Sequence, residues 1–317
     1  MAAGALPLLA AVRTASTGGA ADVVTFHQDS ARTGQNLNET ILTPATVTVG
    51  TFGKTRFFPT DGKVDAQPLF LSAVSVPGVG VRDVLYAATE HDSVYAFDAG
   101  SGSILWQVSL LGANETTSDT HGCSQVTPEI GITSTPVIDR SRGPNGTIYV
   151  VAMSKTAAGA YVQRLHALDA VFGSEMFGGP QTVQASYPGT GAGSSGGLVF
   201  FAPGQYEERA GLLEVNGQII TTWTSHCDID PYTGWVIAYD AGTLAPSSVL
   251  NLTPNGSRGG IWMAGAGPAA DADGNMYLLD GNGTFDTTLT AIGFPSKGDF
   301  GNAFIKIATT GGLSVAD

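Results

Sequence analysis

Histidine and acidic residues that could bind a cation or a polar ligand gather in three stretches of the chain. The first is Glu90-His91-Asp92, the second runs from His121 to Glu129, and the third runs from His226 to Asp230. Imidazole and carboxylate groups bind metal ions, transfer protons and form hydrogen bonds with polar ligands. Each stretch falls between apolar runs, so we expect all three in loops, where binding residues tend to accumulate.

The chain has two cysteines, Cys123 and Cys227, which allow three arrangements. They are too few for a disulfide scaffold or a CxxC zinc site. They could form one disulfide, remain separate buried thiols, or share a metal ion with His121 or His226. Both fall in loops that we expect on the same face of neighbouring units, so we predict a disulfide with Cα atoms within roughly 7 Å of each other. We predict no metal site.

The elements that position these loops follow a repeated plan. Residues 84 to 106, VLYAATEHDSVYAFDAGSGSILW, alternate short apolar runs with turn residues and predict strand, turn, strand, turn and strand. A further strand precedes this segment and each of its later copies, so each unit has four antiparallel strands, named A to D in chain order. The copies are anchored about 70 residues apart, at Asp98, Asp169, Asp240 and Ile307.

These units predict an all-β fold, a β-propeller of four-stranded antiparallel blades. A small sheet cannot bury both of its faces alone, so repeated sheets are expected to stack radially. Four blades are visible, at residues 66–110, 131–183, 211–252 and 267–317. Because successive strands alternate in direction, the D–A and B–C loops lie on one face of the propeller.

That face carries most of the residues that could do chemistry, and we expect it to bind a protein or a small polar ligand. The alternative is that long surface loops collect polar residues in any case and that the tryptophans pack between blades. His166, in strand C of the second blade, is expected to be a core histidine. The ligand-face candidates are His91, His121, Glu129, His226, Asp228, Trp235 and Trp262.

Composition and charge exclude some classes of function. The formal net charge is −13, from 27 acidic and 14 basic residues, so nucleic acid is a poor partner. Residues 1–21 hold a short apolar run followed by small residues, which is typical of a secretory signal peptide, although the basic start is missing. The run is too short to cross a bilayer. We expect an extracytoplasmic protein, periplasmic or secreted; the alternative is a disordered leader.

The N-terminal segment, residues 22–60, contains DSARTGQN, LTPATV and FGKTRFF and is followed by AQPLF. Together with GITSTPVID and VYAFDAGSGSILW, it resembles the quinoprotein (PQQ-dependent) alcohol dehydrogenases and related PQQ-repeat β-propellers. The resemblance covers nearly the whole chain from Asp22 and implies a ring of seven or eight blades, with PQQ and Ca²⁺ as possible cofactors. The chain departs from the catalytic members because it has no adjacent pair of cysteines and shows only four blades.

We therefore consider two hypotheses for function. The first is an exported PQQ-like repeat protein that acts as a binding or scaffolding module without catalysis. The second is a PQQ- and calcium-dependent alcohol or sugar dehydrogenase, or a fragment of one. Residues 52–58 are expected to be an outer strand that closes a longer ring, and such a fragment would self-associate. The competing hypothesis is a closed ring of four blades, with this strand paired to blade four.

Overall fold

The computed structural model describes residues 21–317, which form strands and loops and include no helix. The predicted all-β class is confirmed. All but the last residue of the predicted signal peptide lies outside the described part of the chain. Within that part, no helix has the length and apolar character needed to cross a membrane.

Blade one is an antiparallel sheet whose four strands pair in chain order. Its two middle strands are apolar runs separated by the loop Glu90-His91-Asp92, in which Asp92 adopts a positive φ of 53°. The strands are β1 (Leu69–Val76), β2 (Gly80–Ala88), β3 (Ser93–Asp98) and β4 (Ile104–Ser109).

Blades two and three have five strands each. In both blades strand B is long, and strand A, the inner strand, pairs with only one part of it. A short strand from the preceding loop pairs with the other part, before the predicted blade starts at residues 131 and 211. Blade two contains β5 (Thr116–Thr117), β6 (Val137–Asp139), β7 (Thr147–Lys155), β8 (Tyr161–Asp169) and β9 (Gln181–Thr182). Blade three contains β12 (Tyr206–Glu208), β13 (Leu213–Val215), β14 (Gln218–Ser225), β15 (Trp235–Asp240) and β16 (Pro246–Asn251).

Blade four again has four strands in chain order, and a separate hairpin lies between blades two and three in the sequence. The hairpin consists of β10 (Ser186–Pro188) and β11 (Leu198–Phe200). Blade four contains β17 (Ala269–Ala270), β18 (Met276–Leu279), β19 (Phe304–Ala308) and β20 (Ser314–Val315).

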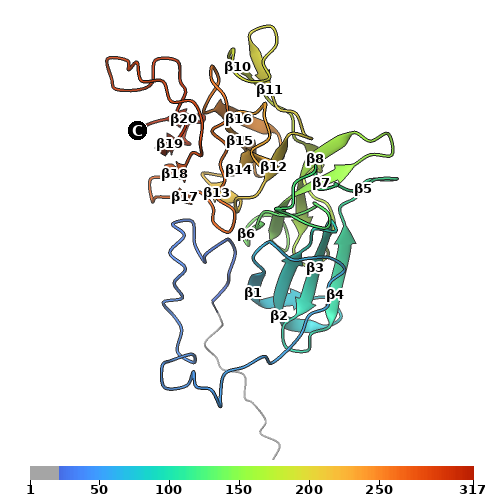
Figure 1. Cartoon of the computed structure of the whole chain (residues 1–317). Coiled ribbons are helices and arrows are strands. Elements are labelled where there is room, and N and C mark those ends of the chain that lie inside the picture. Colours follow the sequence, from blue (N-terminus) through green and yellow to red (C-terminus); the bar gives the residue numbers. More distant parts are fainter. Residues whose placement is uncertain (1–20) are drawn as a thin grey trace, which may run out of the picture.

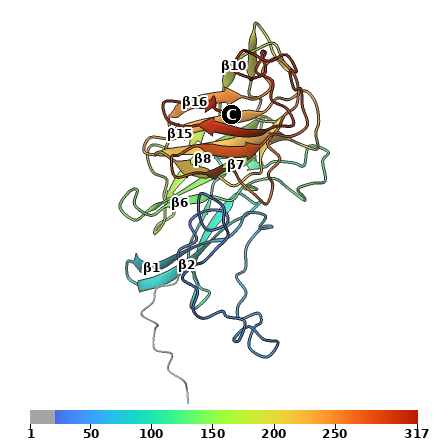
Figure 2. The ribbon, with the colours of Figure 1, turned by 90° about the vertical axis from the view of Figure 1, so that its left-hand side faces the viewer.

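Consecutive blades pack face to face through apolar layers. Alternate residues of a strand point to opposite faces of its sheet, so a middle strand contributes to two layers. Leu165 and Ala167 of β8 belong to the layer between blades two and three, whereas Leu168 belongs to the layer between blades one and two. Figure 1 shows the sheets following one another from cyan to red, and Figure 2 shows the same order from the side.

The C–D turns explain why aspartate recurs at the anchors. The Oδ1 atoms of Asp98, Asp169 and Asp240 each accept a hydrogen bond from the backbone N–H two residues later. A short carboxylate that binds its own turn favours this conformation locally. The repeat of about 70 residues therefore reflects the same aspartate turn in blades one to three, whereas blade four has Ile307 at this anchor.

The N-terminal segment crosses the inner strands of all four blades. Arg32 is central to this arrangement, because its guanidinium donates to the carbonyl oxygens of Phe26, Leu212 and Pro268. Burial lowers the pKa of Arg32 to about 10. Hydrogen bonds join Val23 to Phe70, Val24 to Ile138, Arg32 to Leu212 and Ser30 to Ala270.

Residues 52–58, expected to form an outer strand, form no strand in the structure and pair with none of the described sheets, including blade four. Most of this stretch is exposed to solvent. Phe58 instead packs on Phe97 of blade one. A strand needs a partner edge, and residues 52–58 form a backbone ladder with none of the described sheet edges.

Candidate functional site

The connections that precede the four inner strands meet at an open cavity of about 260 Å³, which we call the axial mouth. Lys63 and Asp65 precede β1 of blade one, Thr133 precedes β6 of blade two and Arg209 precedes β13 of blade three. Ala264 and Gly265 lead into blade four and complete the wall. The N-terminal segment contacts the same inner strands further along, so the mouth opens on the face of the D–A and B–C loops.

Both signs of charge line the axial mouth. Lys63 and Asp65 form an ion pair of 2.8 Å between Nζ and Oδ2. Arg209 forms no ion pair among residues 21–317 and donates from Nη1 to the Gln125 side-chain oxygen at 2.8 Å. Its Nε is buried without a hydrogen-bond partner there. The mouth therefore offers a guanidinium donor whose capacity is only partly used.

Glu90, in the B–C loop of blade one, approaches the same wall from below the surface. It is fully buried, and its Oε2 accepts hydrogen bonds from Gly131 N at 2.8 Å and Thr133 Oγ1 at 3.1 Å. Burial raises the pKa of Glu90 to about 8, and the neighbouring Asp65 adds to this shift. Asp92 is also buried, and burial raises its pKa well above the usual range. Glu90 therefore holds its proton near neutral pH.

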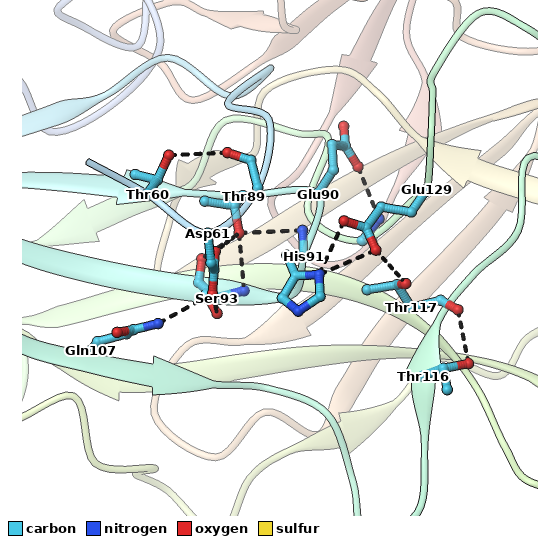
Figure 3. Close-up of polar contacts among 12 residues, drawn as sticks. Thr60, Asp61, Thr89, Glu90, His91, Ser93, Gln107, Thr116, Thr117 and Glu129 are labelled. Atoms are coloured by element: carbon cyan, nitrogen blue, oxygen red, sulfur yellow. Dashed lines mark hydrogen bonds and ion pairs between the residues drawn. The ribbon is translucent and has the colours of Figure 1, made fainter. Parts of the chain in front are cut away.

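His91 and Glu129 form a second polar cluster on the same face (Figure 3). His91 Nδ1 lies 3.0 Å from Oε1 and 3.2 Å from Oε2 of Glu129. Thr117 Oγ1 donates to Glu129 Oε2 at 2.7 Å, which fixes the carboxylate. The His91 side chain remains partly exposed. The pair could accept or deliver a proton at the surface.

His121 and His226 lie against each other, with parallel rings whose centroids are 4.0 Å apart. Burial lowers the pKa of His121 to about 4, and the neighbouring His226 adds to the shift. Ser118 Oγ lies 3.0 Å from His121 Nε2. His226 Nδ1 lies 3.3 Å from Glu207 Oε2, but the angle does not make this a hydrogen bond.

A disulfide joins Cys123 and Cys227, whose Cα atoms are 5.6 Å apart. It ties the D–A loop before blade two to the B–C loop of blade three. The bridge follows His226 directly and lies two residues after His121, so it holds the two loops that carry the stacked imidazoles. In residues 21–317, no three histidine, cysteine, aspartate or glutamate side chains are arranged to hold a metal ion.

The remaining candidates lie apart from these clusters. Asp228 pairs with Arg258 at 3.1 Å and accepts hydrogen bonds from Asn282. Trp262 packs edge-on against Tyr232. The prediction that Trp235 lies on the ligand face is wrong, because its side chain is 0% exposed in β15 and cannot stack on a ligand.

The physical reason is that Trp235 points into the layer between blades two and three. Its ring meets Phe201 and Tyr206 edge-on. Edge-to-face aromatic packing of this kind is favourable in cores. The alternative that the tryptophans pack between blades is therefore correct for Trp235.

The structure thus brings His91 to Glu129 and His121 to His226, and it leaves Asp228 and Trp262 in a separate network. Residues of the axial mouth were missed as candidates. A signal was present, since Lys63, Thr133 and Arg209 each stand a few residues before an inner strand. Nothing in a single blade indicates that these positions converge, because convergence needs the ring.

Comparison with solved structures finds β-propeller enzymes. Quinohemoprotein alcohol dehydrogenase from Comamonas testosteroni is 17% identical, with a TM-score of 0.50 over 93% of this chain and 40% of that protein. A europium-containing methanol dehydrogenase is 14% identical, with a TM-score of 0.52 over 82% of this chain and 42% of that protein. The chain has the fold of a PQQ-type β-propeller.

The chain spans about two fifths of each of those enzymes. BamB from Moraxella catarrhalis is matched with 15% identity and a TM-score of 0.32, over 70% of this chain and 59% of that protein, which is too weak for an argument. No family model matches the sequence, and no curated protein matches it significantly. The likeness concerns the fold, and function rests on the site.

Proposed function

We propose that this chain is a binding module whose axial mouth takes a small polar molecule. The observation that carries the proposal is the convergence of the D–A connections of all four blades on one open cavity with unused hydrogen-bonding groups. Ligand sites are concave and have a few polar groups that fix orientation. Arg209 and Thr133 supply such groups.

We also propose that the module works outside the cytoplasm. The bridge between Cys123 and Cys227 supports this, because disulfides persist in oxidising compartments. The position of the disulfide also supports the face of the D–A and B–C loops as the binding face. It ties the loops of the proposed binding face, where movement would otherwise disturb the site.

The second candidate, a PQQ- and calcium-dependent dehydrogenase, is favoured by the fold. The residues at the mouth do not fit these cofactors. A cavity of about 260 Å³ falls below the roughly 300–1,000 Å³ of sites for drug-sized ligands, and PQQ is a rigid tricycle of that class. Calcium takes about six to eight oxygen ligands. Here Asp65 is engaged by Lys63, and Glu90 holds its proton.

Native mass spectrometry of the full chain, purified from its expression host, tests the proposal. We expect the chain to retain a small molecule that Ala264→Trp loses, because the indole would fill the mouth. Ala158→Trp, at the exposed turn between β7 and β8, is the matched control and should retain it.

Two outcomes would contradict the proposal. One is a chain with nothing bound, or with a molecule that Ala264→Trp retains. The other is saturable uptake of PQQ with Ca²⁺, followed by dye reduction with a simple alcohol, which would establish the dehydrogenase instead.

A further inference from the structure

A second cavity, of about 470 Å³, lies between the outer edge of blade one and strand β8 of blade two. It is separate from the axial mouth and shares none of its lining residues. Its size lies within the range of small-molecule sites. The wall is mainly apolar, with Val108, Leu110, Leu111, Leu168 and Pro180, and it also includes His166.

His166 is 3% exposed and has one ring nitrogen without a partner. Its Nδ1 lies 2.9 Å from Glu175 Oε2, and the other oxygen of Glu175 accepts from the backbone N–H of Ala167 at 2.9 Å. Glu175 therefore holds the ring by Nδ1. His166 Nε2 is buried and has no hydrogen-bond partner within residues 21–317. A buried polar atom of this kind is costly unless something binds it.

The other basic side chain of the cavity is already satisfied. Arg164 forms two hydrogen bonds with Glu115, at 2.7 and 2.6 Å, and a third with Ser154. Its guanidinium is thus directed at blade two itself. His166 Nε2 is the group that remains for a ligand.

Blade three has an apolar residue at the position that His166 occupies in blade two. His166 stands three residues before the turn aspartate of blade two, and Ile237 holds the same position in blade three. Ile237 is fully buried in the apolar layer between blades two and three. Packing between blades therefore requires no imidazole at this position, yet one is present where the two sheets leave a cavity.

We propose that this cavity binds a small, mainly apolar molecule that carries one hydroxyl group, and that the hydroxyl forms a hydrogen bond with His166 Nε2. A hydroxyl group can donate its O–H to an unprotonated ring nitrogen, and its oxygen can accept from a protonated one, so it satisfies Nε2 in either state. The apolar wall removes the rest of the molecule from water.

The test compares two probes of similar shape on the full chain, 2-naphthol and 2-methylnaphthalene, by equilibrium dialysis. We expect 2-naphthol to bind at least about tenfold more tightly, because a site with a buried polar group discriminates against an analogue that leaves it unpaired. His166→Ile should abolish this preference, since it introduces the residue of blade three. Leu111→Trp should weaken both probes by filling the cavity.

A spectroscopic readout keeps the proposal testable if His166→Ile does not fold. With ¹⁵N-labelled wild-type protein, the Nε2 resonance of His166 should shift on addition of 2-naphthol and stay unchanged with 2-methylnaphthalene. Equal affinities for the two probes, a preference that survives in folded His166→Ile, or an unchanged Nε2 resonance would overturn the proposal and leave water as the partner of His166.

Discussion

Blade one and blade four each turn one face away from the other blades, and the two faces differ in what covers them. On blade one, Phe58 from the N-terminal segment packs edge-on against Phe97, with ring centroids 5.3 Å apart. Asp61 accepts hydrogen bonds from Ser93 at 2.6 Å and from Thr89 at 3.1 Å (Figure 3). The segment therefore covers this face with both apolar and polar contacts.

The corresponding face of blade four has no such cover among the described residues. Met276 and Ile305 point toward blade three, so their strand neighbours point the other way. Leu279 is 56% exposed and Phe304 is 67% exposed on that side. Tyr277 lies against Phe304 and shields only part of it.

A blade with two apolar faces therefore needs a neighbour on each side. The N-terminal segment serves as that neighbour for blade one. Exposed apolar patches mark interaction surfaces in soluble proteins. We therefore propose that the free face of blade four is where a further blade or a second copy of the chain would pack, as the longer-ring hypothesis predicts.

The largest expected effect concerns a feature that the two blades share, a buried acid in the B–C loop. Burial raises the pKa of Asp280 in blade four and that of Glu90 in blade one, the latter to about 8. A folded state that holds this proton is stabilised below the unfolded pKa near 4.5, and the contribution is lost as pH rises toward about 8. Each pKa unit corresponds to about 1.4 kcal/mol.

We therefore expect stability to fall by a few kcal/mol (roughly 1.4 kcal/mol per pKa unit) between pH 5 and pH 9. Glu90→Gln should flatten this dependence and be more stable than the wild type at pH 9. Urea unfolding at both pH values measures the effect, with Glu39→Gln, a surface acid, as the control. Parallel curves for Glu90→Gln and the wild type would argue against the shifted proton.

The contact between Phe58 and Phe97, which covers blade one, can be removed by mutation. Phe58→Ala removes the ring that packs on Phe97 and should cost about 2–3 kcal/mol, less than the roughly 3–5 kcal/mol of a core phenylalanine, because Phe58 is only partly buried. Phe57→Ala is the matched control, since its side chain is 73% exposed. Denaturant midpoints compare them, and equal midpoints would mean that the cover contributes nothing.

The free face of blade four predicts self-association. Sedimentation velocity should show oligomers of the full chain, and Leu279→Ser combined with Phe304→Ser should weaken association about tenfold or more, because each large apolar side chain contributes roughly 1.5–3 kcal/mol when buried. Val81→Ser, at an exposed site on blade one, is the control. A wild-type chain that stays monomeric at all concentrations would contradict this.

The smallest effect concerns the polar part of the blade-one cover. Asp61→Ala removes acceptors for Ser93, Thr89 and Gln107 and should cost about 1 kcal/mol or less, because these bonds lie near the surface. Hydrogen exchange should accelerate at residues 89–93 and remain unchanged in blade four. Uniform acceleration in all blades would indicate a global effect rather than loss of the cover.

Local chemistry made much of the fold predictable from the residues. Apolar runs separated by turn residues predicted the middle strands of each blade, and the aspartates at 98, 169 and 240 predicted the C–D turns that the structure contains. The additional strands β5 and β12 were not predicted. They are two and three residues long, and such pieces become strands only because β7 and β14 offer them an edge.

By itself, the sequence determined the all-β class, the four repeated units and the loops that share a face, since alternation and turn preference act within a few residues. Only the tertiary structure decided which loop residues meet. It buried Trp235 between two blades, gathered Lys63, Thr133 and Arg209 at the axial mouth, and placed His166 beside a cavity. Such contacts join residues roughly 70 apart, and the stacking of one sheet on the next creates them.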